Sequence, residues 1–255
     1  MRSRLRGFEA GMDSDLTRGM IRFRPMLVPT LFVAPGLALL VGLGVWQIAR
    51  LHEKEALIAS VQSGLNSAPA PLDALLAVGA TSAEWHHVRV SGQFLHDKEQ
   101  YLFAQGPMGS TGVQVVTPLV QSDGKIVLVD RGFVPDQLRD PARRPQGQVA
   151  GQISLTGVLR LPEKPGAFTP APDLNTRLWF VKDIPAIAKA AGVPALPVLV
   201  EADGAPNPGG WPLGGQTRVD IPNDHLQYAV TWFALALALM GVYFVYHHSR
   251  GRLTL

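Results

Sequence analysis

One histidine stands at the start of an apolar segment that is long enough to be a membrane helix. His225 closely precedes the uncharged stretch at residues 228–246. An imidazole at the boundary of such a helix can coordinate heme iron. The alternative is an interfacial histidine that hydrogen-bonds to the neighbouring domain. Residue type and position leave both interpretations open.

Polar residues end the other uncharged segment of the chain. This segment covers residues 26–46 and is followed by Gln47, Arg50 and, one turn later, Lys54. If both segments are antiparallel helices, these residues leave the membrane on the same side as His225 and at a similar depth. Arg50 and Lys54 can then pair with heme propionates through charge-assisted hydrogen bonds.

Helical spacing extends the candidate site over both segments. Tyr228 and Trp232 follow His225 by three and seven residues, so they continue its helical face. Small residues four positions apart allow close helix contact, namely Ala38 with Gly42 and Ala234 with Ala238. From spacing alone we favour the interfacial histidine. If the segments do hold a cofactor, the candidate residues are His225 as metal ligand, accompanied by Trp46, Gln47, Arg50, Lys54, Tyr228 and Trp232.

Other catalytic or metal-binding motifs are incomplete. His52-Glu53 begins like a zinc-protease motif, but Ala56 occupies the place of the second histidine. His86 and His87 are adjacent, so on a strand they face opposite sides and cannot chelate one metal ion together. The absence of cysteine excludes disulfides, thiolate metal sites and cysteine nucleophiles. We predict no catalytic residues and a protein that is not an enzyme.

Asp130 and Arg131 end a predicted strand and form another charged site. One interpretation is a docking or ligand-binding pair at the strand end. The other is that each makes a separate ion pair that fixes the following loop, because neighbours on a strand face opposite ways. We favour the second interpretation.

The two uncharged segments have the length and flanking charge of membrane helices. Residues 26–46 span about 30 Å as a helix, and their long apolar core favours an uncleaved anchor over a signal peptide. Arginines outside both segments predict cytoplasmic termini. We therefore expect a multi-pass protein of the cell inner membrane with its central domain in the periplasm. The intermembrane space of a mitochondrion is the alternative.

The same patterns give the domain boundaries. We predict a cytoplasmic tail at 1–25, a first transmembrane helix at 26–47, an extracytoplasmic α+β domain at 48–224, a second transmembrane helix at 225–246 and a cytoplasmic tail at 247–255. Asn223 is expected to cap the second helix, with Asp224 in its first turn, where the helix dipole favours negative charge.

The region between the helices has the pattern of a β-sheet domain. Predicted strands cover 85–94, 100–103, 113–121, 125–134, 152–160, 177–181 and 198–201, and a short helix covers 184–191. Asp123-Gly124 suits a type I′ turn between the third and fourth strands. The fold class is α+β, with an antiparallel β-sheet or small open barrel domain between two transmembrane helices.

Composition agrees with a membrane protein that does not bind nucleic acid. Charged residues make up 17% of the chain, below the roughly 25% of soluble proteins. The net charge is only +3, and the basic residues are scattered or near the termini. We expect membrane lipid as a partner and no nucleic acid.

Five motifs, in order along the chain, resemble the surfeit locus protein family of cytochrome c oxidase assembly factors. They read Leu43-Gly44-Val45-Trp46-Gln47-Ile48-Ala49-Arg50-Leu51, Gly92-Gln93-Phe94, Gly112-Val113-Gln114-Val115-Val116-Thr117-Pro118-Leu119, Val127-Leu128-Val129-Asp130-Arg131-Gly132-Phe133-Val134-Pro135 and Pro222-Asn223-Asp224-His225-Leu226-Gln227-Tyr228-Ala229-Val230-Thr231-Trp232-Phe233. Asp224 stands where asparagine is common in the family.

The resemblance implies a factor that assists oxidase assembly while heme a enters the catalytic subunit. It implies that His225 is the candidate heme ligand, and that the partners are cytochrome c oxidase subunit 1 and other oxidase assembly factors. The lack of cysteine agrees with heme rather than copper handling, because Cu(I) carriers use soft sulfur ligands. The alternatives are a scaffold that stabilises an oxidase intermediate without binding heme, and a two-span membrane sensor.

Overall fold

The computed structural model describes residues 22–106, 109–217, 219 and 221–254. These residues fall in two compact units, one formed by residues 22–56 and 222–254 and the other by described residues between 57 and 221, and the units are described separately. Our expectations for residues 1–21 lie outside the described residues.

Two long helices dominate the first unit. They are α1 (Leu27–Leu65), whose last residues belong to the second unit, and α5 (His225–Ser249). Both are long and apolar enough to cross a membrane, with mean hydropathies of 2.1 and 1.9 in their most apolar windows. Most of their apolar side chains are exposed, as at Leu27, Leu31 and Leu237. Such a surface is unfavourable in water and fits a membrane protein.

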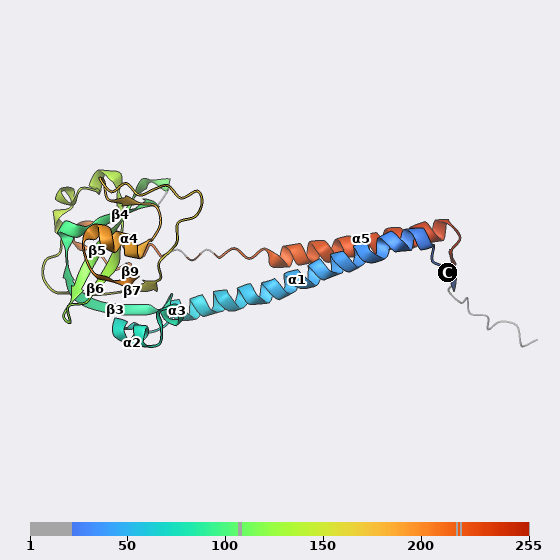
Figure 1. Cartoon of the computed structure of the whole chain (residues 1–255), viewed down its shortest axis with the longest axis horizontal. Coiled ribbons are helices and arrows are strands. Elements are labelled where there is room, and N and C mark those ends of the chain that lie inside the picture. Colours follow the sequence, from blue (N-terminus) through green and yellow to red (C-terminus); the bar gives the residue numbers. More distant parts are fainter. Residues whose placement is uncertain (1–21, 107–108, 218, 220, 255) are drawn as a thin grey trace, which may run out of the picture. The chain divides into compact units, whose positions relative to one another are not determined.

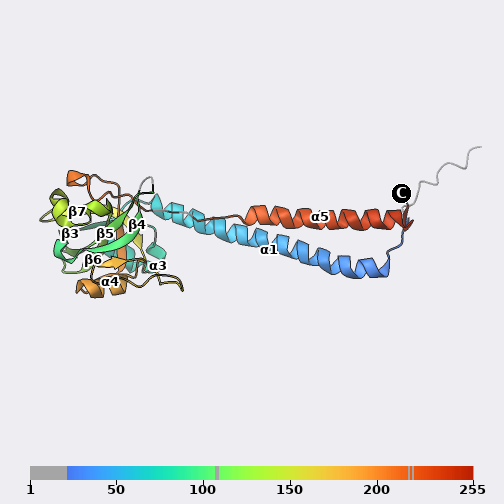
Figure 2. The same cartoon turned by 90° about the horizontal axis from the view of Figure 1, so that it is seen from above.

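The two helices run alongside each other and make close contacts (Figures 1 and 2). A β-carbon added at Gly44 would come within 2.7 Å of the Phe233 ring, and one added at Gly36 would lie 3.5 Å from Leu239. On α5, Ala229 and Ala236 are buried. Small residues therefore allow a close approach of the two backbones.

The small residues at this contact differ from those that the sequence predicted. Ala38, Gly42, Ala234 and Ala238 all lie on exposed sides of their helices. A β-carbon at Gly42 would meet no atom within 4 Å. The prediction was wrong because a spacing of four identifies a stripe without showing which way it faces, and a shift of two residues turns a helix by about 200°.

Polar contacts join the helices at the end of α5. The backbone N–H of Met26 donates to Nε2 of His247 at 3.0 Å, and Nδ1–H of His247 donates to the Tyr243 carbonyl at 2.9 Å. The hydroxyls of Thr30 and Tyr243 lie 2.6 Å apart. His247 is fully buried, and both of its ring nitrogens have partners.

A short antiparallel ladder lies just outside this end of the helices. It pairs β1 (Arg22–Phe23) with β10 (Leu253–Thr254). The ring of Phe23 lies 5.3 Å from that of His247, centroid to centroid. The chain segments that flank the two helices are therefore tied together.

One mixed eight-stranded sheet forms the second unit. Its strands are β2 (Ala70–Pro71), β3 (His87–Phe94), β4 (Gln100–Gln105), β5 (Thr111–Gln121), β6 (Ile126–Pro135), β7 (Ile153–Arg160), β8 (Leu178–Trp179) and β9 (Ala195–Ala202). Their order is β2-β3-β7-β9-β6-β5-β4-β8, and β3 also pairs with β5. Five strands thus close into a barrel-like ring, which confirms the predicted α+β class.

Short helices connect the strands. They are α2 (Leu72–Ala77), α3 (Ala80–Ala83) and α4 (Ile184–Ala191), with 3₁₀ turns η1 (His96–Lys98), η3 (Asp136–Leu138), η4 (Pro141–Arg143), η5 (Pro145–Gly147) and η6 (Pro208–Gly210). The predicted helix at 184–191 is confirmed. Only Gly124 has a positive φ, +82°, in the turn between β5 and β6, so the turn is not type I′, which requires two such residues.

Gly92 allows the ring to close. It is the residue at which β3 is paired with Ile153 of β7 on one side and with Gln121 of β5 on the other. A β-carbon at Gly92 would lie 2.2 Å from the carbonyl oxygen of Val120, which is too close for two non-bonded atoms. Glycine is therefore required where three strands meet.

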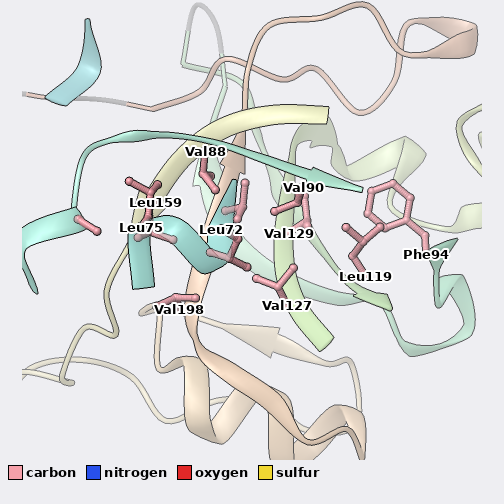
Figure 3. Packing of buried hydrophobic residues seen from close by; sticks show 12 residues of the cluster. Leu72, Leu75, Val88, Val90, Phe94, Leu119, Val127, Val129, Leu159 and Val198 are labelled. Carbon is pink, nitrogen blue, oxygen red and sulfur yellow. The ribbon is translucent and has the colours of Figure 1, made fainter. Parts of the chain in front are cut away.

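The ring encloses one hydrophobic cluster, and α4 covers a second. Figure 3 shows Val88 and Val90 of β3 with Val127 and Val129 of β6 in the first cluster. Leu128, between the last two, faces the other way into the cluster under α4. Successive residues on a strand point to opposite faces, so β6 is buried on both sides.

A buried carboxylate holds two arginines beside this sheet. Glu99 Oε2 accepts from Arg144 Nη2 at 2.5 Å, and Glu99 Oε1 accepts from Arg131 Nη1 at 3.4 Å. Arg131 also donates to the Gly147 carbonyl. Burial opposes ionisation of Glu99, but the nearby ring of His96, whose Nδ1 is 3.7 Å from Oε1, the hydrogen bonds from Arg144 and the charges of both arginines outweigh it and lower its pKa.

Two further buried carboxylates lie side by side between β6 and β9. Asp130 and Glu201 are partners in this parallel ladder. Glu201 Oε1 accepts from Arg160 and Lys182, whereas Asp130 Oδ1 accepts only from the Gly132 N–H and its Oδ2 is buried without a partner in the described residues. Burial and the neighbouring carboxylate of Glu201 raise the pKa of Asp130 to about 7.

Asp130 and Arg131 therefore act separately. Asp130 faces Glu201, and Arg131 faces Glu99 and Gly147 on the other side of β6. The two residues thus have separate partners, as predicted, and Arg131 makes the predicted ion pair, with Glu99. The ion pair predicted for Asp130 is wrong, because among the described residues its carboxylate accepts only the Gly132 N–H.

The helix contact predicts a specific crosslink. Cysteines at Gly36→Cys and Leu239→Cys should be joined efficiently by a short thiol-reactive crosslinker, because these positions face each other and the chain has no other cysteine. A protease site inserted after Gly166, in an exposed loop, then lets a gel report whether the two fragments remain linked. The control pairs Gly42→Cys with Leu239→Cys. Equal crosslinking of both pairs would contradict the described contact.

The buried Asp130 predicts an unusual dependence of stability on pH. Its pKa is about 7 when folded and about 3.9 in an unfolded chain. The stabilisation from its protonated form is complete below pH 4 and is lost as the pH rises towards 7. Asp130→Asn keeps an acceptor for Gly132 and cannot ionise. Its thermal unfolding midpoint relative to the unsubstituted chain should therefore rise between pH 5 and pH 8.

The control for this measurement is Asp123→Asn. Asp123 lies in an exposed turn, where hydrogen bonds from Lys125 lower its pKa, so its replacement should produce no such rise. A difference between Asp130→Asn and the unsubstituted chain that stays constant from pH 5 to pH 8 would show that Asp130 is ionised throughout.

Candidate functional site

The candidate site lies where α5 begins, beside α1 in the same unit. The Asp224 carbonyl accepts the first helical hydrogen bond, from the Tyr228 N–H at 3.2 Å. Asp224 is therefore the N-cap residue, and its side chain makes no capping hydrogen bond. The predicted cap at Asn223 is wrong by one residue. His225 is the first residue of the helix and is half-buried.

The structure brings Gln47 of α1 and His225 together. Gln47 Oε1 lies 2.7 Å from His225 Nδ1, although 178 residues separate them in the chain. Gln47 is 8% exposed and faces α5, three residues beyond Gly44. The pair is thus the next level of the same helix contact that includes Gly44 and Phe233.

The direction of this hydrogen bond follows from its chemistry. An amide oxygen only accepts, so Nδ1 of His225 carries the hydrogen and donates it to Gln47. The other ring nitrogen, Nε2, has no hydrogen-bond partner in the described part of the chain. An imidazole in this state has an unshared electron pair on Nε2, which is what a metal ligand requires.

Two predicted aromatic residues lie on the outside of the helix pair. Trp46 and Tyr228 are 49% and 55% exposed. Arg50 lies with its guanidinium carbon 5.8 Å from the Trp46 ring centre, and its Nη1 donates to Glu53 at 2.7 Å. The structure thus places Arg50 with Trp46, and gives it an exposed carboxylate partner that sequence analysis did not consider.

The register of the helices separates the remaining predicted residues. Because α1 and α5 are antiparallel and Gln47 is level with His225, Arg50 lies about 4.5 Å and Lys54 about 10 Å past that level along α1. Trp232 lies about 10 Å away in the opposite direction, within the helix pair. Lys54 has no ion pair among the described residues. Among the hydrogen bonds, ion pairs and ring contacts of the described residues, Gln47 with His225 is the one that joins candidate residues across the helices.

The donor set fits one axial ligand of a heme. His225 offers a nitrogen without a partner, Trp46 and Tyr228 offer exposed aromatic surface, and Arg50 offers a cation. Heme iron is commonly held by a histidine nitrogen. In the described residues no three His, Asp or Glu side chains gather to hold a free metal ion.

A hollow of about 500 Å³ lies elsewhere, in the second unit. It is lined in part by His96, Glu99, Tyr101, Gln148 and Arg177. Several of these side chains already bind one another or the backbone, as Arg177 does through the carbonyls of Asp97 and Glu99. The hollow contains none of the predicted site residues. Because several of its polar side chains are used in contacts within the protein, we assign these side chains a structural role.

The most specific contacts in both units are not evident from the sequence. Gln47 and His225 were both candidates, but nothing in the sequence alone indicated that one donates to the other. A lone amide that directly follows an uncharged segment is the one sequence signal for this contact, because a buried amide needs a hydrogen-bond partner. Glu99 and Arg144 were not singled out, since 45 residues separate them.

Comparison with known proteins identifies relatives along most of the chain. The sequence pattern of the SURF1 family matches residues 35–237. The SURF1-like protein of Monosiga brevicollis is 37% identical over 224 residues, which cover 82% of this chain and 84% of that protein.

Two vertebrate proteins give similar values. Surfeit locus protein 1 of Rattus norvegicus is 39% identical over 218 residues, which cover 80% of this chain and 70% of that protein. Surfeit locus protein 1 of Homo sapiens is 36% identical over 219 residues, with coverages of 80% and 72%. Since the family pattern extends from α1 through the sheet into α5 and includes Gln47 and His225, the chain belongs to the SURF1 family.

Proposed function

We propose that this protein is a membrane-anchored assembly factor for cytochrome c oxidase, a heme–copper oxidase, and that it holds heme a before the heme enters the catalytic subunit. Membership of the SURF1 family and the motifs at both helix ends support the assembly role. The observation that carries the heme part is the imidazole of His225, which is held through Nδ1 and unbonded at Nε2.

Each residue of the site has a separate task in this proposal. His225 would hold the iron through Nε2. Heme a, when bound, supplies the metal centre and a flat apolar ring. Trp46 and Tyr228 provide aromatic surface, which is favourable against an apolar ring. Arg50 exchanges its exposed partner Glu53 for a propionate, a small cost because exposed ion pairs contribute at most about 1 kcal/mol.

Lys54 and Trp232 have weaker support. Lys54 lies about 10 Å past the level of His225, and its long side chain serves the outer end of the site. Trp232 is half-buried and lies about 10 Å from the level of His225 in the opposite direction. These two residues extend the site along α1 and α5, and neither contacts the His225 ring in our proposal.

The proposed location follows the flanking charges. Both helices cross the cell inner membrane, both termini are cytoplasmic and the second unit lies in the periplasm. The partners are cytochrome c oxidase subunit 1, other oxidase assembly factors and membrane lipid. The protein acts by holding a cofactor rather than by catalysing a reaction.

Heme binding is tested on the purified full-length chain. Protein isolated in detergent from cells that make heme a should show the absorption spectrum of bound heme, and His225→Ala should lose most of it. The matched control is His52→Ala, because His52 is an exposed histidine on the same face of the proposed membrane, paired with Glu55 at 3.5 Å. If the unsubstituted protein is isolated without heme, the heme-binding proposal fails and the alternative of a scaffold that does not bind heme remains.

The assembly role is tested in cells. Deleting the gene should lower oxidase activity in isolated membranes, and the unsubstituted gene should restore it. If the His225→Ala gene restores full oxidase activity, with the variant protein present in the same amount as the unsubstituted one, then the assembly role does not require heme binding by His225. Normal oxidase activity in the deletion strain would contradict the assembly role altogether.

A further inference from the structure

The Gln47 side chain is costly where it lies. It is 8% exposed and lies between α1 and α5, three residues along α1 from the apolar contact of Gly44 with Phe233. Burying an amide without a hydrogen bond costs free energy, and a leucine of similar size would pack there without that cost. The amide is therefore explained by what its oxygen does, which is to accept Nδ1–H of His225 at 2.7 Å.

The bond selects one of two forms of the imidazole. A neutral histidine carries its hydrogen on Nδ1 or on Nε2, and the hydrogen bond made by one nitrogen decides which. With the hydrogen on Nε2, the Gln47 amide would have to turn its NH2 group towards Nδ1, and Nε2 could not bind a metal. In the structure the amide oxygen faces Nδ1, and this orientation requires the hydrogen on Nδ1. With the hydrogen on Nδ1, the contact is favourable and Nε2 is available.

We propose that Gln47 is a positioning residue for His225, which holds the ring hydrogen on Nδ1, fixes the ring orientation and so presents Nε2 as the ligand nitrogen. The identity of the ligand, a heme, rests on the proposed function. The state of the ring does not, because it belongs to the protein without any cofactor.

His247 provides an internal comparison on the same helix. Its Nδ1–H donates to the Tyr243 carbonyl, and its Nε2 accepts from the Met26 N–H. Both histidines thus carry the hydrogen on Nδ1. Only His247 uses Nε2 for a protein contact, so His247 is structural. His225 has the same ring state with its Nε2 left without a protein partner in the described residues.

A neutral acceptor has a consequence for ligand strength. A carboxylate accepts a stronger hydrogen bond than an amide does, and a stronger acceptor on the far nitrogen makes an imidazole a more basic ligand. Gln47 therefore orients His225 without making it as strong a ligand as a glutamate would. This intermediate strength suits a protein that must release what it holds.

The state of the ring is measured first, without heme. The full chain is labelled with ¹⁵N-histidine in detergent at pH 8, and the His225 signals are identified by their absence in His225→Asn. We expect the shifts of a ring protonated on Nδ1 in the unsubstituted chain and a mixture of both forms in Gln47→Leu. Protonation on Nε2 in the unsubstituted chain would overturn the proposal, whatever the protein binds.

The effect on binding is measured with hemin as the probe. Gln47→Leu should weaken hemin binding by about 10- to 100-fold, the range typical for loss of a ligand's hydrogen-bond partner. Gln47→Glu should retain binding within about threefold and lower the midpoint potential of the iron. Gln227→Leu is the matched control, because Gln227 is exposed two residues from His225, and it should behave like the unsubstituted chain.

Two checks separate a positioning role from a packing role. The Gly36→Cys and Leu239→Cys crosslink should form equally well with Gln47→Leu, which shows that the helices still pair. In a His225→Ala background, Gln47→Leu should cause no further loss of hemin binding, because residues that act through one contact are not additive.

The outcomes distinguish this inference from the proposed function. If the unsubstituted chain and His225→Ala bind hemin equally, heme ligation by His225 fails, while the ¹⁵N result still decides the role of Gln47 in setting the ring. If His225→Ala loses binding and Gln47→Leu keeps both affinity and midpoint potential, the positioning role fails and heme ligation stands. Equal values for Gln47→Leu and Gln47→Glu would also overturn it, since only one of them restores an acceptor.

Discussion

The register of α1 against α5 is the constraint on which the candidate site depends. A shift of one residue moves a helical side chain by about 1.5 Å along the axis and about 100° around it. Such a shift would take Gln47 out of reach of His225. Polar contacts fix the register at both ends, through Gln47 with His225 and through Met26 with His247. Between them lie the hydroxyl pair of Thr30 and Tyr243, one turn from Met26, and a contact at Gly44 that is too close for a larger residue.

These contacts gain their importance from their surroundings. The outward faces of both helices are apolar, and polar groups that leave water there must bind each other or remain unsatisfied. A hydrogen bond is also stronger in a medium of low dielectric constant. Few polar contacts are therefore enough to define one pairing. The glycines contribute close packing, which alone would permit neighbouring registers.

The sequence predicted the elements better than it predicted their contacts. Uncharged length identified α1 and α5, and period-two patterns with turn residues identified the strands, because these signals are local. The facing of a helix is not local, so Ala38 and Gly42 were chosen where Gly36 and Gly44 make the contact. Gln47 and His225 were predicted, from antiparallel geometry, to lie on the same side of the membrane at a similar depth. Their hydrogen bond could not be predicted in this way, because it depends on both the rotation of each helix about its axis and the register of α1 against α5.

The second unit shows the same division between local and distant signals. The strand from residue 126 was evident from its apolar run, yet the partners of its charged end were not. Arg131 meets Glu99, and Asp130 meets Glu201, across pairings that join strands far apart in the chain. A charged residue at a strand end has an identifiable face but no identifiable partner until the sheet order is known. The ring closure at Gly92 settles that order.

The two buried or half-buried histidines of α5 show how the same side chain can serve structure or chemistry. His247 satisfies both nitrogens within the protein and is fully buried, so binding a metal would require breaking the contact that holds Met26. His225 satisfies one nitrogen and lies at the accessible first turn of the helix. Metal coordination there would break no hydrogen bond of the described residues, and Gln47 would keep its partner. The geometry therefore favours His225 as the residue that binds and releases a ligand while α1 and α5 keep their register.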